Sequence, residues 1–364
     1  MNLKQTLLPV VCAALFCGCA PCKDEMSSPA SSSTKFKKMY TFFTPSTKEE
    51  VELMKKYHVV GTAVHNKPES IKLLNEAGIG AYIAFGPEGS HRSVWNKEEQ
   101  EVYDYLNAAD VSDKADRAKE SMRRIKEGRY SWGGEPLPGV KFIGRTEVFS
   151  EGQLPCIIGE KSRKKACEKL DKICAVPGID GVAFDYVGYT NYHSCEHPEC
   201  LKLCAEYLKK NNLPDTEENR ERFYLHELAE YYRVCAEHIR KINPRFKVMA
   251  HLYPVFLPEP LYGNRLEIDI AGETCAWYRI WDVKKVEEYA RYIVENQHKY
   301  HKNTQCVPFL AVTTSDFADI KTPEIIDREL QAILKSGTDS LMVHEFHSLI
   351  KSPEFMAVFD KYFE

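Results

Sequence analysis

The sequence predicts one α/β domain, a single (β/α)8 TIM barrel with an insertion after the third strand. Eight short apolar runs rich in β-branched and aromatic residues alternate with amphipathic helical patterns along the chain. Each run is apolar at most positions, as expected for the strands of a parallel sheet that is covered on both faces. The length of 364 residues suits one such barrel with insertions.

The expected strands and helices follow one another in order from residue 39. The eight strand candidates are MYTFFTP, HVVGTAVH, GAYIAFGP, GVAFDYVGY, KVMAHLYP, EIDIAGET, CVPFLAVTT and SLMVHEFH. Helical patterns lie at about 46–57, 68–77, 160–175, 199–211 with 217–242, 282–300 and 323–336, and several begin with Ser or Thr followed by acidic residues. A doubly wound open sheet is the alternative. The segment FFTPSTKEE after the first strand lacks the glycine-rich phosphate turn that is typical of that fold.

Residues 88–156 interrupt this alternation. They contain two charged helical patterns, the Gly/Pro-rich turn WGGEPLPG and the strand-like run VKFIGRTEVF. Counting that run as a barrel strand would give nine strands. We therefore expect the segment to form a lid or hairpin over the mouth of the barrel.

The first 37 residues differ from the rest in composition. Residues 1–18 hold an apolar stretch that is too short to span a bilayer, which indicates a signal peptide. The small residues before Cys19 resemble the lipobox of bacterial lipoproteins, and this resemblance implies cleavage before Cys19 and lipidation of its thiol. A plain secretory signal is the alternative. Residues 19–37 are rich in Ser, Pro and charge and predict a flexible tether, so the barrel domain is expected to cover 38–364.

The charge balance and the cysteines limit the partners and cofactors. Lys and Arg total 49 against 53 acidic residues, without a prominent basic run, so nucleic acid is not an expected partner. A disulfide is most plausible within CEHPECLKLC, where Cys200 and Cys204 share a helix face and Cys195 precedes them. A zinc knuckle of Cys195, His197, Cys200 and Cys204 is the alternative. Its spacing is not a standard one, so no metal and no cofactor is predicted.

Polar residues gather at the carboxyl ends of the expected strands, which form the active-site face of such a barrel. They are His65, Glu88, Asp185, His251, Tyr253, Glu273, Ser315, Asp316, Glu345 and His347. Strand alternation puts Asp185, Glu273 and Glu345 each on one face of its strand, and we expect the three to converge on one opening. Neighbouring carboxylates acquire different proton affinities, as acid/base hydrolysis of an acetal requires. Asp185, Glu273 and Glu345 are therefore the predicted catalytic residues.

Aromatic and histidine side chains near the same strand ends are predicted to bind substrate. Sugar rings lay their apolar C–H faces on aromatic rings while their hydroxyls reach polar groups. The predicted substrate-binding residues are Tyr186, Tyr189, His65, His251, Tyr253 and Trp277. For Trp277 and Trp281, four residues apart, packing on one helix face is the alternative.

The stretch GIDGVAFDYVGY resembles the Gly-(Ile/Val)-Asp-Gly-Ile-x-Phe-Asp-Tyr-(Ile/Val)-Arg-Tyr-Pro motif of the hypothetical glycoside hydrolase-like (β/α)8 proteins common among bacterial lipoproteins. The resemblance implies that Asp185 stands at that family's strand-four aspartate. The family's Arg-Tyr-Pro is replaced by Gly188, Tyr189 and Thr190, so a basic contact to substrate is missing. The loop CEHPECLKLCAEYL also resembles the Cys-rich loop that follows this strand in related barrels.

An aspartate on strand four with an acid on strand six also resembles the arrangement of retaining α-glycosidase barrels. That likeness implies that Asp185 is the nucleophile and Glu273 the general acid/base, with Glu345 or His251 orienting the sugar ring. The sequence thus predicts a glycoside hydrolase that acts on extracellular or periplasmic glycans and is lipid-anchored to a bacterial membrane, at the outer membrane or cell surface. The alternatives are a non-catalytic glycan-binding lipoprotein and a metal-dependent hydrolase on the same barrel. The latter usually needs His-x-His on the first strand, which MYTFFTP lacks.

Overall fold

The computed structural model describes residues 34–86, 156–187, 197–252, 266–277, 281–299, 301–314 and 321–363. The chain divides into two units, Met1–Ser31 and Ser32–Glu364, and every described residue belongs to the second. The predicted signal peptide, Cys19, most of the tether and nearly all of the insertion at 88–156 lie outside the described residues.

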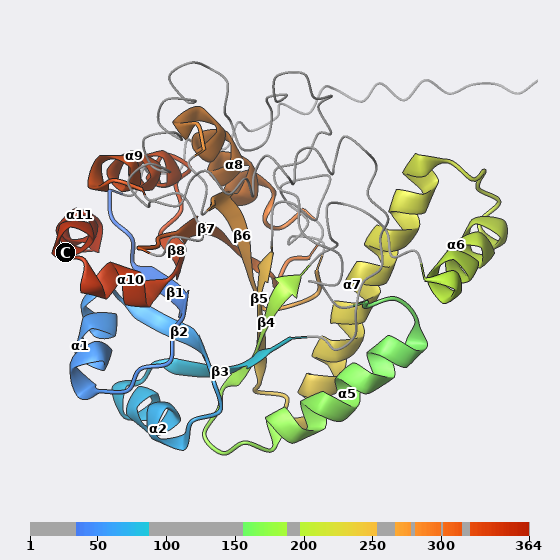
Figure 1. Cartoon of the computed structure of the whole chain (residues 1–364), viewed down its shortest axis with the longest axis horizontal. Coiled ribbons are helices and arrows are strands. Elements are labelled where there is room, and N and C mark those ends of the chain that lie inside the picture. Colours follow the sequence, from blue (N-terminus) through green and yellow to red (C-terminus); the bar gives the residue numbers. More distant parts are fainter. Residues whose placement is uncertain are drawn as a thin grey trace, which may run out of the picture. The chain divides into compact units, whose positions relative to one another are not determined.

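Eight parallel strands close into a barrel in sequence order, with β8 returning to pair with β1, as the sequence predicts. Figure 1 shows these strands in the centre and the helices around them. The strands are β1 (Lys38–Phe42), β2 (Val59–Val64), β3 (Gly80–Phe85), β4 (Gly181–Val187), β5 (Lys247–Leu252), β6 (Ile270–Ala276), β7 (Gln305–Ala311) and β8 (Ser340–His344). The predicted strands all form, and β6 begins three residues later than EIDIAGET suggests.

Several of the helices begin at residues whose side chains cap them. The described helices are α1 (Lys48–Lys56), α2 (Pro68–Ala77), α5 (Glu160–Cys174), α6 (Pro198–Lys210), α7 (Glu217–Ile242), α8 (Val283–Asn296), α9 (Pro323–Leu334), α10 (Phe346–Lys351) and α11 (Pro353–Phe363). Thr47 and Glu50 form a capping box at α1, and the Thr216, Asp282 and Thr322 side chains cap α7, α8 and α9. The sequence analysis did not predict α10 and α11. The six residues of α10 are too few to show a helical period.

Alternation along the strands divides side chains between the barrel interior and the surrounding helices. A Cβ built on Gly272 would lie 2.1 Å from the Met342 Sδ of β8, so this position of β6 faces the interior, where Met342 fills the space. On β4, Phe184 faces outward, and its ring centroid lies 5.0 Å from that of Tyr232 on α7. The next residue, Asp185, therefore points to the interior.

The first and last described segments meet on the outside of the barrel. The Phe36 amide donates to the Tyr362 carbonyl at 2.9 Å, and the rings of Phe36 and Phe363 stack with centroids 5.4 Å apart. These contacts hold α11 against the residues that lead into β1.

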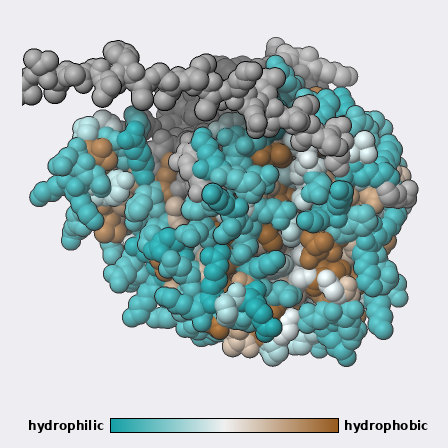
Figure 2. Space-filling model, turned by 180° about the vertical axis from the view of Figure 1, so that it is seen from behind, coloured by the Kyte–Doolittle hydropathy of each residue, from teal (hydrophilic) through white to brown (hydrophobic). Residues whose placement is uncertain are grey.

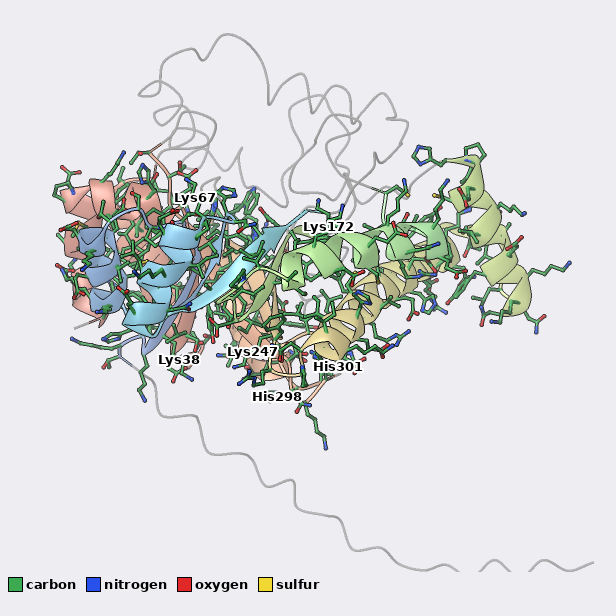
Figure 3. The ribbon with its side chains drawn as sticks, turned by 90° about the horizontal axis from the view of Figure 1, so that it is seen from below. Lys38, Lys67, Lys172, Lys247, His298 and His301 are labelled. Carbon is green, nitrogen blue, oxygen red and sulfur yellow. The ribbon has the colours of Figure 1, made fainter. Side chains whose placement is uncertain are left out.

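The strands all run in one direction, which gives the barrel two different ends. In Figure 3, Lys38 and Lys247, which begin β1 and β5, lie on one side, and Lys67, which follows β2, lies on the other.

The face drawn in Figure 2 is largely hydrophilic, with small apolar patches between the charged groups. None of the described helices combines the length and apolar composition needed to span a bilayer.

Candidate active site at the carboxyl end of the barrel

Asp185 lies on β4 near the carboxyl end of the barrel, where the sequence places it. Val182 and Phe184 are fully buried on the outer face of the strand, and Phe184 packs between Phe85 and Tyr232. This packing fixes the face on which Asp185 projects. Its side chain is 28% exposed, so the carboxylate stands at the border between the packed interior and solvent.

His251 of β5 contacts the Asp185 carboxylate directly. The distance from His251 Nδ1 to Asp185 Oδ1 is 3.3 Å, and His251 Nε2 lies 3.2 Å from the Thr274 Oγ1 of β6. The Thr274 hydroxyl donates to the Leu252 carbonyl at 2.8 Å, an oxygen that can only accept. The Thr274 oxygen is therefore left to accept from His251 Nε2–H.

The contact places a carboxylate and an imidazole side by side at the edge of the mouth, with His251 Nδ1 and Asp185 Oδ1 3.3 Å apart. These are the two kinds of side chain that general acid/base catalysis uses most often. The pair is therefore the described part of the mouth best suited to proton transfer.

Aromatic side chains fix the His251 ring. It stacks on Phe309 of β7 with centroids 3.8 Å apart and an interplanar angle of 10°. Phe42 of β1 meets the ring edge-on at 6.0 Å, and Trp277 lies at 5.8 Å. The predicted substrate-binding residues His251 and Trp277 thus lie in one cluster. Trp277 is only 2% exposed, so it supports this cluster from behind in the described part of the chain.

His344 at the end of β8 belongs to the same cluster, and the sequence reading did not select it. Its ring lies 5.7 Å from that of Phe42 and 6.5 Å from that of Phe309. Burial lowers the pKa of His344 to about 4, an effect that the nearby Asp185 carboxylate opposes and His251 strengthens. His344 is therefore neutral at pH 7 and can exchange hydrogen bonds without adding a charge.

The lowered pKa of His344 predicts a loss of stability in mild acid. The unfolded chain binds a proton on this histidine below about pH 6.5, whereas the folded chain resists protonation until about pH 4. The contribution of neutral His344 to the free energy of unfolding is fully present above pH 6.5 and is lost as the pH drops towards 4. Between neutral pH and about pH 4.5, the free energy of unfolding should fall by about 2 kcal/mol less in His344→Gln than in the wild type. Urea unfolding followed by fluorescence measures both values. The exposed His65→Gln substitution is the control, and parallel curves for His344→Gln and wild type would contradict the prediction.

Glu345 lies beside His344 and is held by hydroxyl groups. Its Oε2 accepts from Ser348 Oγ at 2.8 Å and from Thr313 Oγ1 at 3.2 Å. The residue is half-buried and starts α10 as its N-cap. The expected alignment of Glu345 with Leu341 and Val343 on the interior face is wrong, because Met342 and His344 occupy that face. Glu345 instead lies where the strand has already turned into α10.

Glu273 does not share an opening with Asp185, and this expectation is corrected. Gly272 and Thr274 face the interior of β6, so Glu273 points between them to the outer layer. There it lies beside Cys306, whose Sγ contacts the Gln297 carbonyl after α8, and it helps burial to raise the pKa of that thiol. Glu273 is fully buried. Its predicted catalytic role remains untested, and this position does not favour it.

The remaining predicted substrate-binding residues lie apart from this cluster or outside the described residues. His65 follows β2 and is exposed, with its amide donating to Thr44 Oγ1 at 3.0 Å. The backbone of Tyr186 continues β4, but its side chain is outside the described part, as are Tyr189 and Tyr253 altogether.

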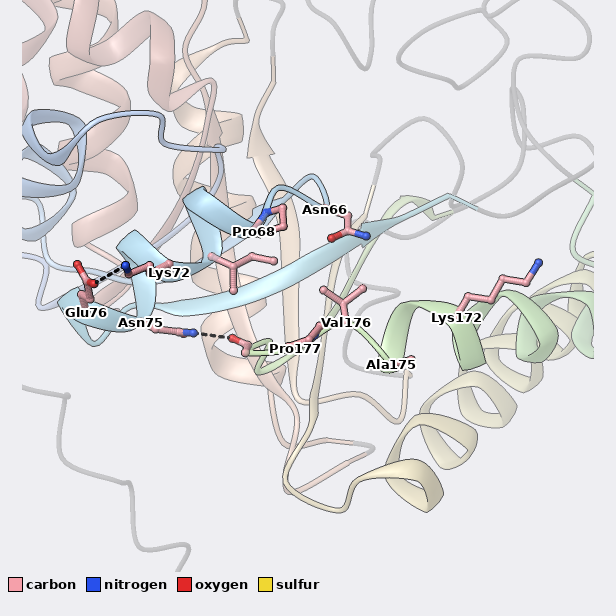
Figure 4. A pocket seen from close by; sticks show the side chains of 11 residues that line it. Asn66, Pro68, Lys72, Asn75, Glu76, Lys172, Ala175, Val176 and Pro177 are labelled. Atoms are coloured by element: carbon pink, nitrogen blue, oxygen red, sulfur yellow. Dashed lines mark hydrogen bonds and ion pairs between the residues drawn. The ribbon is translucent and has the colours of Figure 1, made fainter.

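A separate cavity lies on the flank of the barrel rather than at the mouth. It has a volume of about 550 Å³ and lies between α2 and the turn from α5 into β4. Figure 4 shows the Asn75 side chain reaching the Gly178 carbonyl across it, at 2.9 Å. None of Asp185, His251 and His344 lines it, and we do not assign chemistry to it.

No protein-family model matches the sequence, and no curated protein matches it. Among solved structures, the chain is similar to alpha-L-fucosidase isoenzyme 2 from Paenibacillus thiaminolyticus, with 12% identity over 90% of this chain and 49% of that chain and a TM-score of 0.50. It is also similar to the PgaB (BpsB) glycoside hydrolase domain from Bordetella bronchiseptica, with 10% identity over 90% of this chain and 99% of that chain and a TM-score of 0.53. The chain thus spans about half the length of the fucosidase. These likenesses agree with the (β/α)8 barrel fold of the chain.

Proposed function

We propose that the protein hydrolyses glycosidic bonds of glycans at the carboxyl end of its barrel, with Asp185 as the central catalytic residue. The observation that carries the proposal is the contact between Asp185 and His251 at the barrel mouth, 3.3 Å between Oδ1 and Nδ1. A partly exposed carboxylate in contact with a buried imidazole is the kind of group that general acid/base chemistry uses. The similarity to two glycoside hydrolase barrels supports an acetal as the bond attacked.

The reaction needs a proton for the leaving oxygen and a base or nucleophile at the anomeric carbon. In the proposed reaction, the Asp185–His251 pair exchanges the proton, the bond to the leaving sugar breaks, and water supplies the new hydroxyl and restores the proton. Glu345, held by Ser348 and Thr313, is the proposed second carboxylate, since it lies next to His344 at the same end of the barrel. Phe42, Phe309 and neutral His344 form the apolar wall behind the pair.

A release assay tests the proposal. The full chain is incubated with a panel of bacterial, plant and host glycans, and released sugars are quantified by their new reducing ends. Release that depends on Asp185 supports hydrolysis. Glycan binding without any release across the panel would favour the binding-only alternative. Release that chelators abolish and a divalent metal restores, while the melting temperature stays unchanged, would favour the metal-dependent one.

We also propose that the chain is lipid-anchored outside the cytoplasm through Cys19, which lies beyond the described residues. Cys19→Ala expressed in a bacterial host is expected to lose incorporation of labelled fatty acid and to move from the membrane fraction to the soluble fraction. Cys22→Ala is the matched control, because this cysteine lies three residues further along the same segment. Membrane retention of Cys19→Ala with unchanged labelling would contradict lipidation at Cys19.

A further inference from the structure

Three metal-ligating side chains meet where α6 begins. The ligand atoms of Cys156, His197 and Cys200 all lie within 4.8 Å of one another. Cys156 precedes α5, His197 is the N-cap of α6, and Cys200 is in the first turn of α6. The two cysteines are 44 positions apart in the chain, so the fold rather than local sequence brings them together.

We propose that Cys156, His197 and Cys200 bind a zinc ion. The Cys156 and Cys200 sulfurs are 3.6 Å apart. Two thiolates at about 2.3 Å from one tetrahedral zinc are separated by about 3.8 Å, so the observed spacing fits a shared metal. A disulfide would need about 2.05 Å between the sulfurs. The His197 nitrogen lies within 4.8 Å of both sulfurs, so a movement of about 1 Å brings the three atoms to the spacing of ligands of one tetrahedral zinc.

The cluster is accessible from solvent at the start of α6. The Cys200 side chain lies in the first turn of this helix of 13 residues. Zinc converts both thiols to thiolates and two protons pass to solvent, so the bound site carries no excess charge from the sulfurs. Cys200 is buried, while Cys156 and His197 are half-buried, which leaves a route for the ion to enter.

The elements around the cluster hold it in place. A Cβ on Gly159, just before α5, would lie 3.0 Å from Leu203 Cδ1 of α6, so the starts of the two helices are in contact. The Gly159 amide and the Arg163 guanidinium each donate to the Glu227 Oε2 of α7 at 2.8 Å. Figure 1 shows α5, α6 and α7 on the same side of the barrel. A metal here would fasten α5 to α6 at a point that α7 already supports.

This ligand set differs from both interpretations of the CEHPECLKLC loop in the sequence analysis, the internal disulfide and the zinc knuckle. Cys204 lies one turn beyond Cys200 and contacts α7, where burial raises the pKa of its thiol and Tyr224 hydrogen-bonds to it. The Cys200 sulfur contacts that of Cys156. The sequence could not reveal this pair, because Cys156 lies before α5 and the loop's own spacing gives no sign of it.

Metal content of the full chain is the first test. The protein is isolated without added metal, dialysed, and analysed by mass spectrometry for metals, and about one zinc per chain is expected. Removing the zinc with a chelator should lower the melting temperature, since a ligand bound only to the folded state stabilises it. Cobalt(II) added to the reduced, metal-free protein should give a thiolate-to-cobalt charge-transfer band.

Variants identify the ligands. Cys156→Ser, Cys200→Ser and His197→Ala should each weaken zinc binding by at least about 10-fold and the first two should reduce the cobalt band. Cys167→Ser and Cys204→Ser are matched controls on α5 and α6 and should keep the metal. His197 is half-buried and its side chain makes no capping hydrogen bond to α6, so His197→Ala is expected to fold even where a cysteine variant does not.

Two results would overturn the proposal. One is a metal-free chain in which peptide mapping finds a disulfide between Cys156 and Cys200, because oxidation competes for the same sulfurs. The other is zinc that persists in Cys156→Ser and His197→Ala but is lost in Cys204→Ser, which would place the metal within the CEHPECLKLC loop.

Discussion

Asp185→Asn is expected to lower kcat/KM on a responsive glycan by about 10²–10⁴-fold, the range of a lost general acid or base. Asparagine keeps the shape of the side chain and can still pair with His251, but it can neither ionise nor take part in proton exchange. Binding of the glycan should change little, because the wall of Phe42, Phe309 and His344 remains. The measurement is steady-state release from the substrate found in the panel, together with its equilibrium binding.

Asp171→Asn is the matched control for this experiment. Asp171 on α5 pairs with His238 on α7 at 2.7 Å, which gives the same two residue types in contact, but on the outside of the barrel. Its carboxylate is 58% exposed, and an exposed pair contributes little to stability. Asp171→Asn should therefore retain full turnover. Equal activity of Asp185→Asn and wild type would refute the role proposed for Asp185 while leaving the zinc proposal untouched.

Gly181→Ala is expected to destabilise the fold by about 3 kcal/mol or more, the largest effect on stability that we predict. A Cβ at Gly181 would lie 1.9 Å from the Lys247 carbonyl oxygen and 2.8 Å from the Lys247 carbonyl carbon and amide nitrogen. These are backbone atoms of β5, which pairs with β4 at this residue, so no side-chain rotation can relieve the overlap. The two strands would have to separate where their pairing begins.

Gly86→Ala is the control, since a Cβ there has no neighbour within 4 Å in the described part of the chain and the residue does not have a positive φ. Urea unfolding of both variants, followed by circular dichroism, gives the two free energies of unfolding. A lower midpoint for Gly181→Ala and an unchanged midpoint for Gly86→Ala are expected. Equal midpoints would show that β4 and β5 adjust to the methyl group.

The sequence predicted the barrel well, because the strands and most of the helices carry their own local signals. Apolar runs bounded by Gly and Pro marked the strands, and Thr47, Thr216 and Thr322 marked helix starts. The helices α10 and α11 were not predicted, although Ser352 precedes Pro353 at the start of α11 as Thr322 precedes Pro323 at α9. The predicted lid, signal peptide and tether fall outside the described residues and stay predictions.

The site was harder to predict. The alternation of side chains along a strand separates two faces, but it does not tell which face points to the barrel interior. Asp185 was placed correctly, since its outward neighbours Val182 and Phe184 are larger than Ala183. On β6 the same reasoning failed. The inner face there carries Gly272, whose missing side chain is compensated by Met342 from across the barrel. The contact between an interior glycine on one strand and a large interior residue on another joins positions far apart in the sequence. A single sequence gives no sign of such a contact.

His344 was missed for a related reason. Taking Met342 as the interior residue of β8 would have selected His344 two positions later, whereas taking Leu341 selected Glu345. The two choices cannot be separated while every residue from Leu341 to Val343 is apolar. Only the position of Met342 against Gly272 decides between them.

The contact between Phe36 and Tyr362 has a practical consequence for handling the protein. Both ends of the barrel domain emerge together beside the start of β1, at the opposite end from Asp185. A short linker could therefore join them, and a circularly permuted chain opened at an α-to-β connection should still fold. An affinity tag after residue 364, used to immobilise the protein on a biosensor, would leave the mouth turned towards the glycan solution.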